Sequence, residues 1–186
     1  YVHRVIKKAI KNDIAIYAIH TNLDNVLKGG VNENIAKTLG LNHLTILRSK
    51  VNPQFSDREI GSGIVGSFEQ PISEKEVMDI LKSKLSCEVI KHTNLLDRNV
   101  QKMAICGGSG SFLLKDAMKT GADIFLTSDF KYHEFFDADS KIVIMDIGHY
   151  ETEHLTKILL SEILCDKFHN FAAQYSKLNT NPVNYY

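Results

Sequence analysis

Short apolar runs alternate along this chain with segments in which apolar residues recur at helical spacing. Short apolar runs are typical of buried strands, and a recurrence at every third or fourth position is typical of an amphipathic helix. Because strands that alternate with helices form a parallel or mixed sheet, the pattern predicts an α/β protein. We expect strands at 14–19, 61–68, 89–90, 100–106, 124–126, 141–145 and 168–178, and helices at 2–10, 33–39, 74–85, 112–120, 131–138 and 149–163.

Composition narrows the functional classes. The 186 residues are 44% hydrophobic and 24% charged with a net charge of zero, so no basic footprint indicates a nucleic-acid partner. No apolar run approaches the ~20 residues of a membrane span, and we expect no membrane partner. The cysteines Cys87, Cys106 and Cys165 are isolated and lack metal-binding spacing, which favours reduced thiols and a cytoplasmic location.

Polar residues and glycines gather where the predicted strands end. Ligands of open α/β sheets bind at the carboxyl ends of the strands, so such residues indicate a site there. One unusual strand end is common, whereas this chain has several. They are HTNLD at 20–24, GGSGS at 107–111, TSD at 127–129 and DIGH at 146–149.

Two histidine–carboxylate pairs occur at these strand ends. His149 and Glu153 are four residues apart, which places both on one face of a helix. An imidazole and a carboxylate together suit zinc, iron, manganese or nickel. His20 and Asp24 have the same spacing and could supply further ligands or a proton shuttle. The alternatives are a solvated pair at a helix start for the first, and an N-cap aspartate beside a histidine for the second.

The other two strand ends leave alternatives open. Glycines at 107–111 could bring backbone N–H groups to a phosphate, or they could form a tight turn between a strand and a helix. His133, in TSDFKYHE, could act as an acid or base near neutral pH, or it could lie on the exposed face of a helix.

Three segments resemble the Nif-three-like family, whose members are known as GTP cyclohydrolase I type 2 homologues or dinuclear metal-binding proteins. They are IAIYAIHTNLDNV, CGGSGSFLLKDAMKTGADIFLTSDFKYHE and IMDIGHYETE, and the resemblance covers about residues 1–180. It implies two α/β lobes with mixed sheets flanked by helices and a metal cleft between them. It also implies a homo-oligomer, a hexamer built as a trimer of dimers.

The same resemblance implies roles for individual residues. Asp24, His149 and Glu153 correspond to ligands of two divalent metal ions, and His20 and His133 to pocket histidines that move protons. The family's remaining ligands are two adjacent histidines, and no such pair occurs in this sequence.

The domain organisation follows from the resemblance and from the start of the chain. The sequence opens inside an amphipathic pattern without an initiator methionine, so we expect a piece of a longer protein. We assign 1–58 to part of a first lobe without its N-terminal strands, and 59–154 to a second lobe. Residues 155–186 would return to the first lobe as a helix and a strand, and 48–60 would form a junction.

The resemblance favours a metal-dependent hydrolase in which metal ions activate a water molecule against a small-molecule substrate. One alternative is a non-enzymatic metal-binding regulator or an oligomeric interaction scaffold, which would bind metal without turnover. Another is a nucleotide-binding module that uses the glycines at 107–111.

Overall fold

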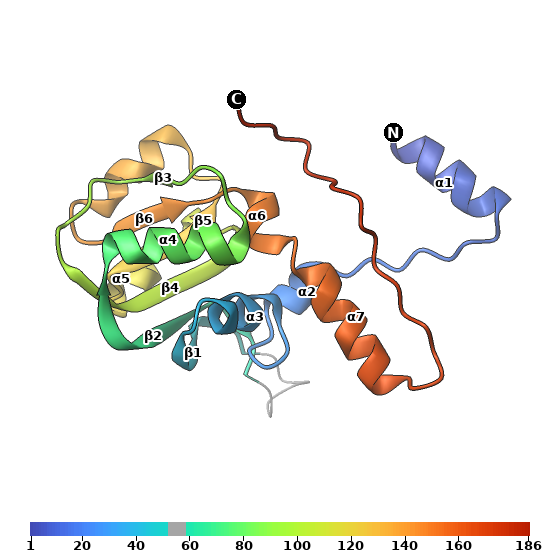
Figure 1. Cartoon of the computed structure of the whole chain (residues 1–186), viewed down its shortest axis with the longest axis horizontal. Coiled ribbons are helices and arrows are strands. Elements are labelled where there is room, and N and C mark those ends of the chain that lie inside the picture. Colours follow the sequence, from blue (N-terminus) through green and yellow to red (C-terminus); the bar gives the residue numbers. More distant parts are fainter. Residues whose placement is uncertain (52–58) are drawn as a thin grey trace.

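One six-stranded mixed sheet organises the computed structural model, which describes residues 1–51 and 59–186 (Figure 1). The strands are β1 (Asn42–Ser49), β2 (Gly61–Ser73), β3 (Lys91–His92), β4 (Asn99–Ser109), β5 (Ile124–Ser128) and β6 (Val143–Asp146). They lie in the order β1-β2-β4-β5-β6-β3, in which β4, β5 and β6 run parallel and the other neighbours run antiparallel. The predicted α/β class is confirmed.

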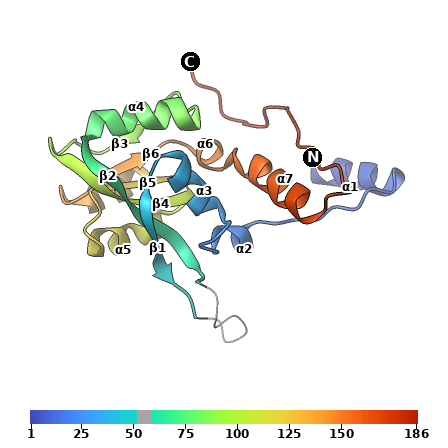
Figure 2. The ribbon, with the colours of Figure 1, turned by 60° about the horizontal axis from the view of Figure 1, so that its bottom comes forward.

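Helices cover both faces of this sheet. One face carries α3 (Val31–Thr38) and α4 (Glu74–Leu85), and the other carries the 3-10 helices η2 (Ser111–Leu113) and η3 (Tyr132–Ala138) with α5 (Leu114–Lys119). Figure 2 shows α4 and α5 on opposite sides of the strands. Neighbouring residues of β5 point to opposite faces of the sheet. Leu126 packs in one core with Leu81 of α4, and Phe125 packs in the other core with Ala117 of α5. This alternation is the strand periodicity expected of a sheet buried on both faces.

The helix boundaries follow the local sequence signals. Ser73 accepts a hydrogen bond from the Glu76 backbone N–H at 3.2 Å, and the Ser73 N–H donates to the Glu76 carboxylate at 2.7 Å, so the two residues form a capping box at the start of α4. Gly40 and Gly121 follow α3 and α5 with φ of 82° and 70°, a conformation that only glycine adopts readily.

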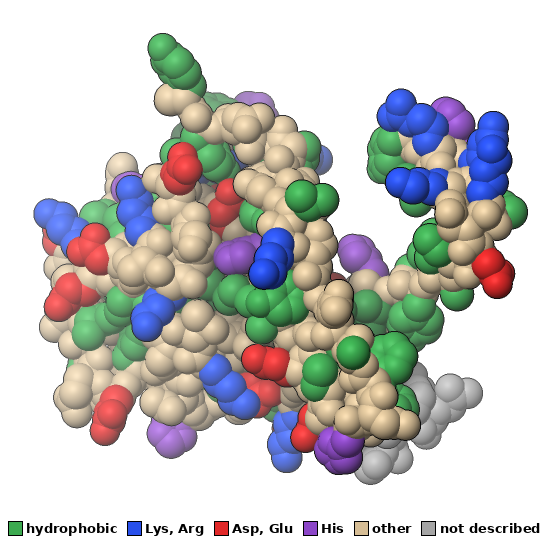
Figure 3. Space-filling view, turned by 45° about the vertical axis from the view of Figure 1, so that its right-hand side comes forward, with side chains coloured by type: hydrophobic (Ala, Val, Ile, Leu, Met, Phe, Trp, Pro, Cys, Tyr) green, Lys and Arg blue, Asp and Glu red, His purple; other side chains and the backbone are tan. Residues whose placement is uncertain are grey.

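The two ends of the chain stand away from the sheet. Helix α1 (Val2–Lys11) projects from the body with its lysines and arginine in view (Figure 3). Helix α7 (Thr156–Lys167) has no buried residue, although its sequence predicts an apolar face. Figure 1 shows the C-terminal segment passing beside α7 as an extended chain.

Two strand predictions at these ends are wrong. Residues 14–19 are extended but form no strand, and Ile16 is 63% exposed. Residues 168–178 likewise form no strand, and Phe171 and Leu178 are exposed. Within the described residues no neighbouring strand lies beside either segment, so neither gains the ladder of hydrogen bonds and the packing that a sheet provides.

The sequence pattern missed one strand and ended another too early. Residues 42–49, for which no strand was predicted, form β1 and pair with β2. Most of the predicted 48–60 junction lies outside the described residues. β4 continues through Gly107, Gly108 and Ser109, with a register shift against β5 between Ile105 and Ser109. The glycine-rich segment is therefore an irregular strand end rather than a turn.

The β1–β2 pairing joins the first predicted lobe to the sheet that holds the second, and the assigned division into 1–58, 59–154 and 155–186 stays a prediction. Within residues 1–51 and 59–186, no helix has the length and apolar character needed to cross a bilayer.

Candidate functional site

His149 and Glu153 lie at the start and end of the short helix α6 (His149–Glu153), directly after β6. Gly148 has a φ of 98°, which lets the chain turn sharply from the strand into the helix. Its N–H donates to the Asp146 carboxylate at 3.1 Å and fixes this turn. The Nε2 atom of His149 lies 3.3 Å from a carboxylate oxygen of Glu153. The spacing of the pair therefore produces the contact expected of residues one helical turn apart.

Asp129 forms a hydrogen bond with the other ring nitrogen of His149. Its carboxylate lies 2.6 Å from Nδ1 of His149, and the residue follows the end of β5. Asp129 was predicted at a strand end from the sequence, but its contact with His149 was not. The signal lies in the topology, since β5 and β6 are parallel neighbours with Thr127 opposite Asp146. Residues just beyond the ends of such strands lie side by side.

His20 and Asp24 meet this pair in one small cavity of about 160 Å³. Asp24 is the last residue of α2 (Thr21–Asp24), and His20 is its N-cap. The structure therefore brings together two histidine–carboxylate pairs that are more than a hundred residues apart in the sequence. The remaining lining residues are Thr21, Asn25, Asn32, Ser62, Gly63, Cys106, Gly107, Ser109 and Phe112.

Asn32 fixes α2 against the end of β4. This side chain is 1% exposed, donates to the backbone carbonyl of Asp24 at 2.9 Å and accepts from the N–H of Gly107 at 2.8 Å. Both groups would otherwise be buried without partners, which is costly. Asn32 was not identified from the sequence, because its partners are set by tertiary packing.

The glycine-rich strand end packs directly against the His149–Glu153 pair. The Gly108 N–H donates to the Thr152 hydroxyl at 2.9 Å, and a Cβ atom on Gly108 would overlap Glu153 Oε1 and lie 3.3 Å from the His149 ring. The N–H groups of Gly107 and Gly108 are thus occupied by side chains. This removes two of the donors that the phosphate-binding alternative requires.

The electrostatics of the cavity reflect two carboxylates in a partly buried space. Burial raises the pKa of Asp24, and the negative charge of Glu153 raises it further, although His20 and His149 act in the opposite direction. Burial alone would lower the pKa of His149. The hydrogen bond to Asp129 and the charges of Glu153 and Asp129 outweigh it, so the pKa of His149 is raised.

A second, larger cavity of about 740 Å³ opens on the other side of the pair. His149, Glu153 and Asp129 line it together with Lys91 and residues of the C-terminal segment. That segment is tethered to a buried carboxylate of α6, because Asn181 donates to Glu151 Oε1 at 3.1 Å and the Tyr185 hydroxyl donates to the same oxygen at 3.4 Å.

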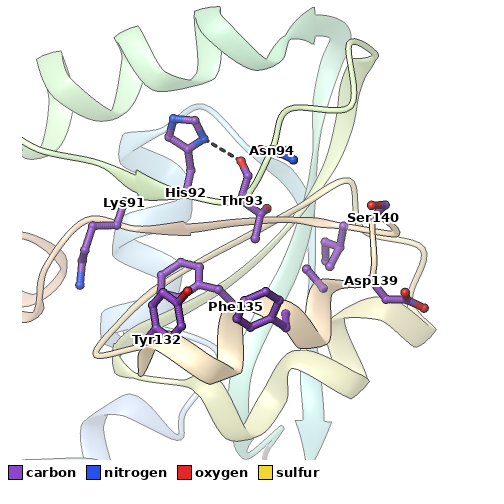
Figure 4. A pocket seen from close by; sticks show the side chains of 11 residues that line it. Lys91, His92, Thr93, Asn94, Tyr132, Phe135, Asp139 and Ser140 are labelled. Atoms are coloured by element: carbon purple, nitrogen blue, oxygen red, sulfur yellow. Dashed lines mark hydrogen bonds between the residues drawn. The ribbon is translucent and has the colours of Figure 1, made fainter.

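His133 lies apart from the other four predicted site residues. It is exposed on η3, in edge contact with Tyr132 at 5.2 Å between ring centroids, and it does not line either cavity described above. Figure 4 shows a separate pocket of about 640 Å³ between β3 and η3, with Tyr132 and Phe135 on one wall and Lys91 to Asn94 on the other. This pocket contains none of the predicted site residues.

The donor types around the small cavity suit a divalent metal ion. The imidazole of His149 and the carboxylates of Asp24 and Glu153 are ligands that zinc, iron and manganese accept. A cation would offset the burial and the negative charge of Glu153, which raise the pKa of Asp24. As the side chains stand, no three histidine, cysteine, aspartate or glutamate residues in the described part of the chain converge closely enough to enclose a metal ion. The residues thus fit the ion in kind, and their side chains would have to move together to bind it.

Comparison with known proteins gives a consistent assignment. The sequence model of a family described as Duf34/NIF3 (NGG1p interacting factor 3) matches residues 1–182. A Clostridium perfringens protein named GTP cyclohydrolase 1 type 2 homolog is 37% identical over 163 residues, which are 86% of this chain and 59% of the relative. The chain therefore spans less than two thirds of that relative.

Solved structures share the fold. Staphylococcus aureus protein SA1388 superposes with a TM-score of 0.88 at 25% identity, covering 98% of this chain and 73% of its own. A Bacillus cereus protein related to NIF3 gives a TM-score of 0.89 at 22% identity, with coverage of 98% and 77%, and at that identity only the fold is comparable.

Proposed function

Since the chain belongs to the Duf34/NIF3 family, we propose that Asp24, His149 and Glu153 are ligands of a divalent-metal site that hydrolyses a small-molecule substrate. One observation carries this proposal: the His20–Asp24 and His149–Glu153 pairs, distant in sequence, line the same cavity. The two-metal centre and the homohexamer that the family resemblance implies are part of the proposal.

A divalent metal ion at this position would lower the pKa of a bound water molecule and polarise the bond to be hydrolysed. The chain's own residues supply the rest. Glu153 and Asp24 place two negative charges around the cavity. His20 contacts the Thr21 hydroxyl through Nδ1 at 2.9 Å, which leaves Nε2 to move a proton at the cavity wall. For proton transfer we therefore favour His20, and the role of His133 stays a prediction.

The adjoining cavity of about 740 Å³ suits the substrate itself, since small-molecule sites have volumes of roughly 300–1,000 Å³. The relatives are named as homologues of GTP cyclohydrolase 1, so GTP is the first compound to test. Lys91 and Lys157 line this cavity and would favour an anionic group on the substrate.

A non-enzymatic metal-binding or scaffold role is the second candidate. The observation that favours it is the exposed apolar surface of the chain ends, where Ile16 and Leu178 are 63% and 74% exposed. The two functions differ in turnover, because a scaffold would bind metal and partners without consuming a substrate.

The test measures bound Mn²⁺ or Zn²⁺ by equilibrium dialysis for the wild-type chain and for Glu153→Gln, together with GTP consumption. Glu153→Gln removes a charged ligand and should lower metal binding and any turnover together. Glu162→Gln, at an exposed position of α7, loses the same charge away from the cavity and should match the wild type. Equal metal binding by Glu153→Gln and the wild type would contradict the ligand assignment. Metal binding without GTP consumption would favour the scaffold.

A further inference from the structure

We propose that Asp129 is a positioning residue for the candidate metal site: its carboxylate accepts a hydrogen bond from Nδ1–H of His149 and so presents Nε2 to Glu153 and the cavity. The inference deepens the proposed function and rests on it. It assigns a role to a residue outside the ligand set and names the nitrogen that would bind the ion.

The geometry of the imidazole carries the first step. Its two nitrogens have different partners, with Asp129 2.6 Å from Nδ1 and Glu153 3.3 Å from Nε2. The contact with Asp129 is in the range of a strong charge-assisted hydrogen bond. The contact with Glu153 is longer, so Nε2 could exchange it for another partner. The His149 side chain is 48% exposed, so packing alone does not hold the ring. Because the terminal torsion of histidine has broad minima, a hydrogen bond is needed to set the ring orientation.

The backbone places Asp129 for this contact at some cost. Its φ is 61°, in the left-handed region that few residues other than glycine, asparagine and aspartate adopt. The next residue, Phe130, is buried in the core, and its N–H donates to the Asp146 carboxylate at 3.0 Å. Strained residues of this kind cluster at functional sites, where the surrounding structure holds them.

The Asp146 side chain connects the two loops that carry Asp129 and His149. Its fully buried carboxylate accepts from Phe130, next to Asp129, and from Gly148, next to His149. Through these two hydrogen bonds, Asp146 fixes the distance between the backbones of Asp129 and His149. This arrangement is built into the strand ends and does not depend on a metal ion.

The chemistry explains why a carboxylate would be used here. A histidine that binds a metal through one nitrogen usually donates its other ring N–H to a carboxylate or carbonyl, which fixes the tautomer and makes the ligand more basic. An asparagine at this position could keep the left-handed backbone, but its amide can donate to Nδ1 and favour the opposite tautomer. Asp129→Asn therefore tests the hydrogen bond with little change of shape.

The experiment compares the wild type with Asp129→Asn, Asp129→Ala and the control Asp137→Asn, which removes the same charge from an exposed position of η3. In metal-free protein, at a pH at which the His149 ring is neutral, nitrogen-15 NMR reports which ring nitrogen carries the proton, and His149→Gln identifies the signal. Equilibrium dialysis against Mn²⁺ or Zn²⁺ then measures affinity. The wild type and Asp137→Asn should show the proton on Nδ1. The Asp129 variants should lose this preference and bind metal about 10–100-fold more weakly.

The outcomes separate this inference from the proposed function. An unchanged tautomer in both Asp129 variants overturns the inference, whatever the metal affinity. A wild type that binds metal, with Asp129→Asn binding equally tightly, also overturns it and leaves the metal site in place. A wild type that binds no metal overturns the proposed function. Circular dichroism checks that each variant is folded, and Asp129→Asn decides the matter if Asp129→Ala is not.

Discussion

The backbone of Gly108 lies directly against the carboxylate of Glu153, so that a Cβ atom on the glycine would overlap Oε1. Gly108 also has a φ of 65°, a conformation that few residues other than glycine, asparagine and aspartate adopt. The glycine thus gives the candidate ligand the space it occupies. This contact gives the glycine-rich strand end a role at the candidate site that requires no bound phosphate.

Gly108→Ala should therefore destabilise the protein and weaken metal binding. The left-handed conformation costs ~1–2 kcal/mol for alanine, and displacing Glu153 should add ~1–3 kcal/mol. Gly121→Ala is the matched control, because Gly121 has a φ of 70° and open space where its Cβ would lie. Urea unfolding and metal dialysis measure both effects. Equal losses in the two variants would mean that the Glu153 contact contributes nothing.

Asn32→Ala should separate α2 from the end of β4. It leaves the Asp24 carbonyl and the Gly107 N–H without their partner in a buried setting, at a cost of roughly 2–4 kcal/mol in the free energy of unfolding. Asn34→Ala removes the same side chain two residues along α3 and should have a much smaller effect. Chemical denaturation tests the pair of variants, and similar values for the two would argue against the role of Asn32.

The buried part of the sheet could be predicted from the sequence because each central strand reads as an apolar run. The same rule failed at 14–19, where an apolar run has no neighbouring strand within the described residues. It also failed at β1, whose sequence NHLTILRS mixes polar and apolar residues because the strand lies at the edge of the sheet. Apolar sequence indicates a tendency to be buried, and only the pairing decides whether burial occurs.

The residues of the candidate site could likewise be predicted only in part. The pairs His20–Asp24 and His149–Glu153 were found because local spacing fixes them. Asp129 and Asn32 were missed because their partners lie 20 and 75 residues away, at distances that depend on strand order and register. Without the sheet topology, a strand-end aspartate and a buried asparagine carry no distinguishing signal.

The three cysteines should differ in reactivity. Burial, together with the charges of Asp24 and Glu153, raises the pKa of Cys106 to about 12, and burial also raises the pKa of Cys87. Because the thiolate is the reactive form, both should remain unmodified at neutral pH. Cys165 is exposed on α7 and should react with iodoacetamide in the folded protein.

Mass spectrometry of the native and urea-unfolded protein measures this difference. We expect one label per folded chain and three per unfolded chain, with none on folded Cys165→Ser. Rapid labelling of Cys106 in the folded state would show that the cavity wall opens.

The raised pKa of His149 should make the stability of the metal-free protein depend on pH. The folded state holds this proton more tightly than the unfolded state, whose ordinary pKa is 6.5. The contribution of His149 to stability is therefore fully present below pH 6.5 and is lost as the pH rises through the raised value. Asp24, whose pKa is also raised, acts with the same sign at lower pH.

Metal binding should show the opposite trend, because Nε2 must lose its proton to act as a ligand. We expect urea unfolding in the presence of a chelator to show that the wild type is more stable than His149→Gln below pH 6.5, and that this difference shrinks as the pH rises above 6.5. The affinity for Mn²⁺ should rise over the same interval. His169→Gln, at an exposed position of the C-terminal segment, should leave both profiles unchanged. Parallel unfolding profiles for the wild type and His149→Gln would show that Asp129 and Glu153 do not hold a proton on this ring.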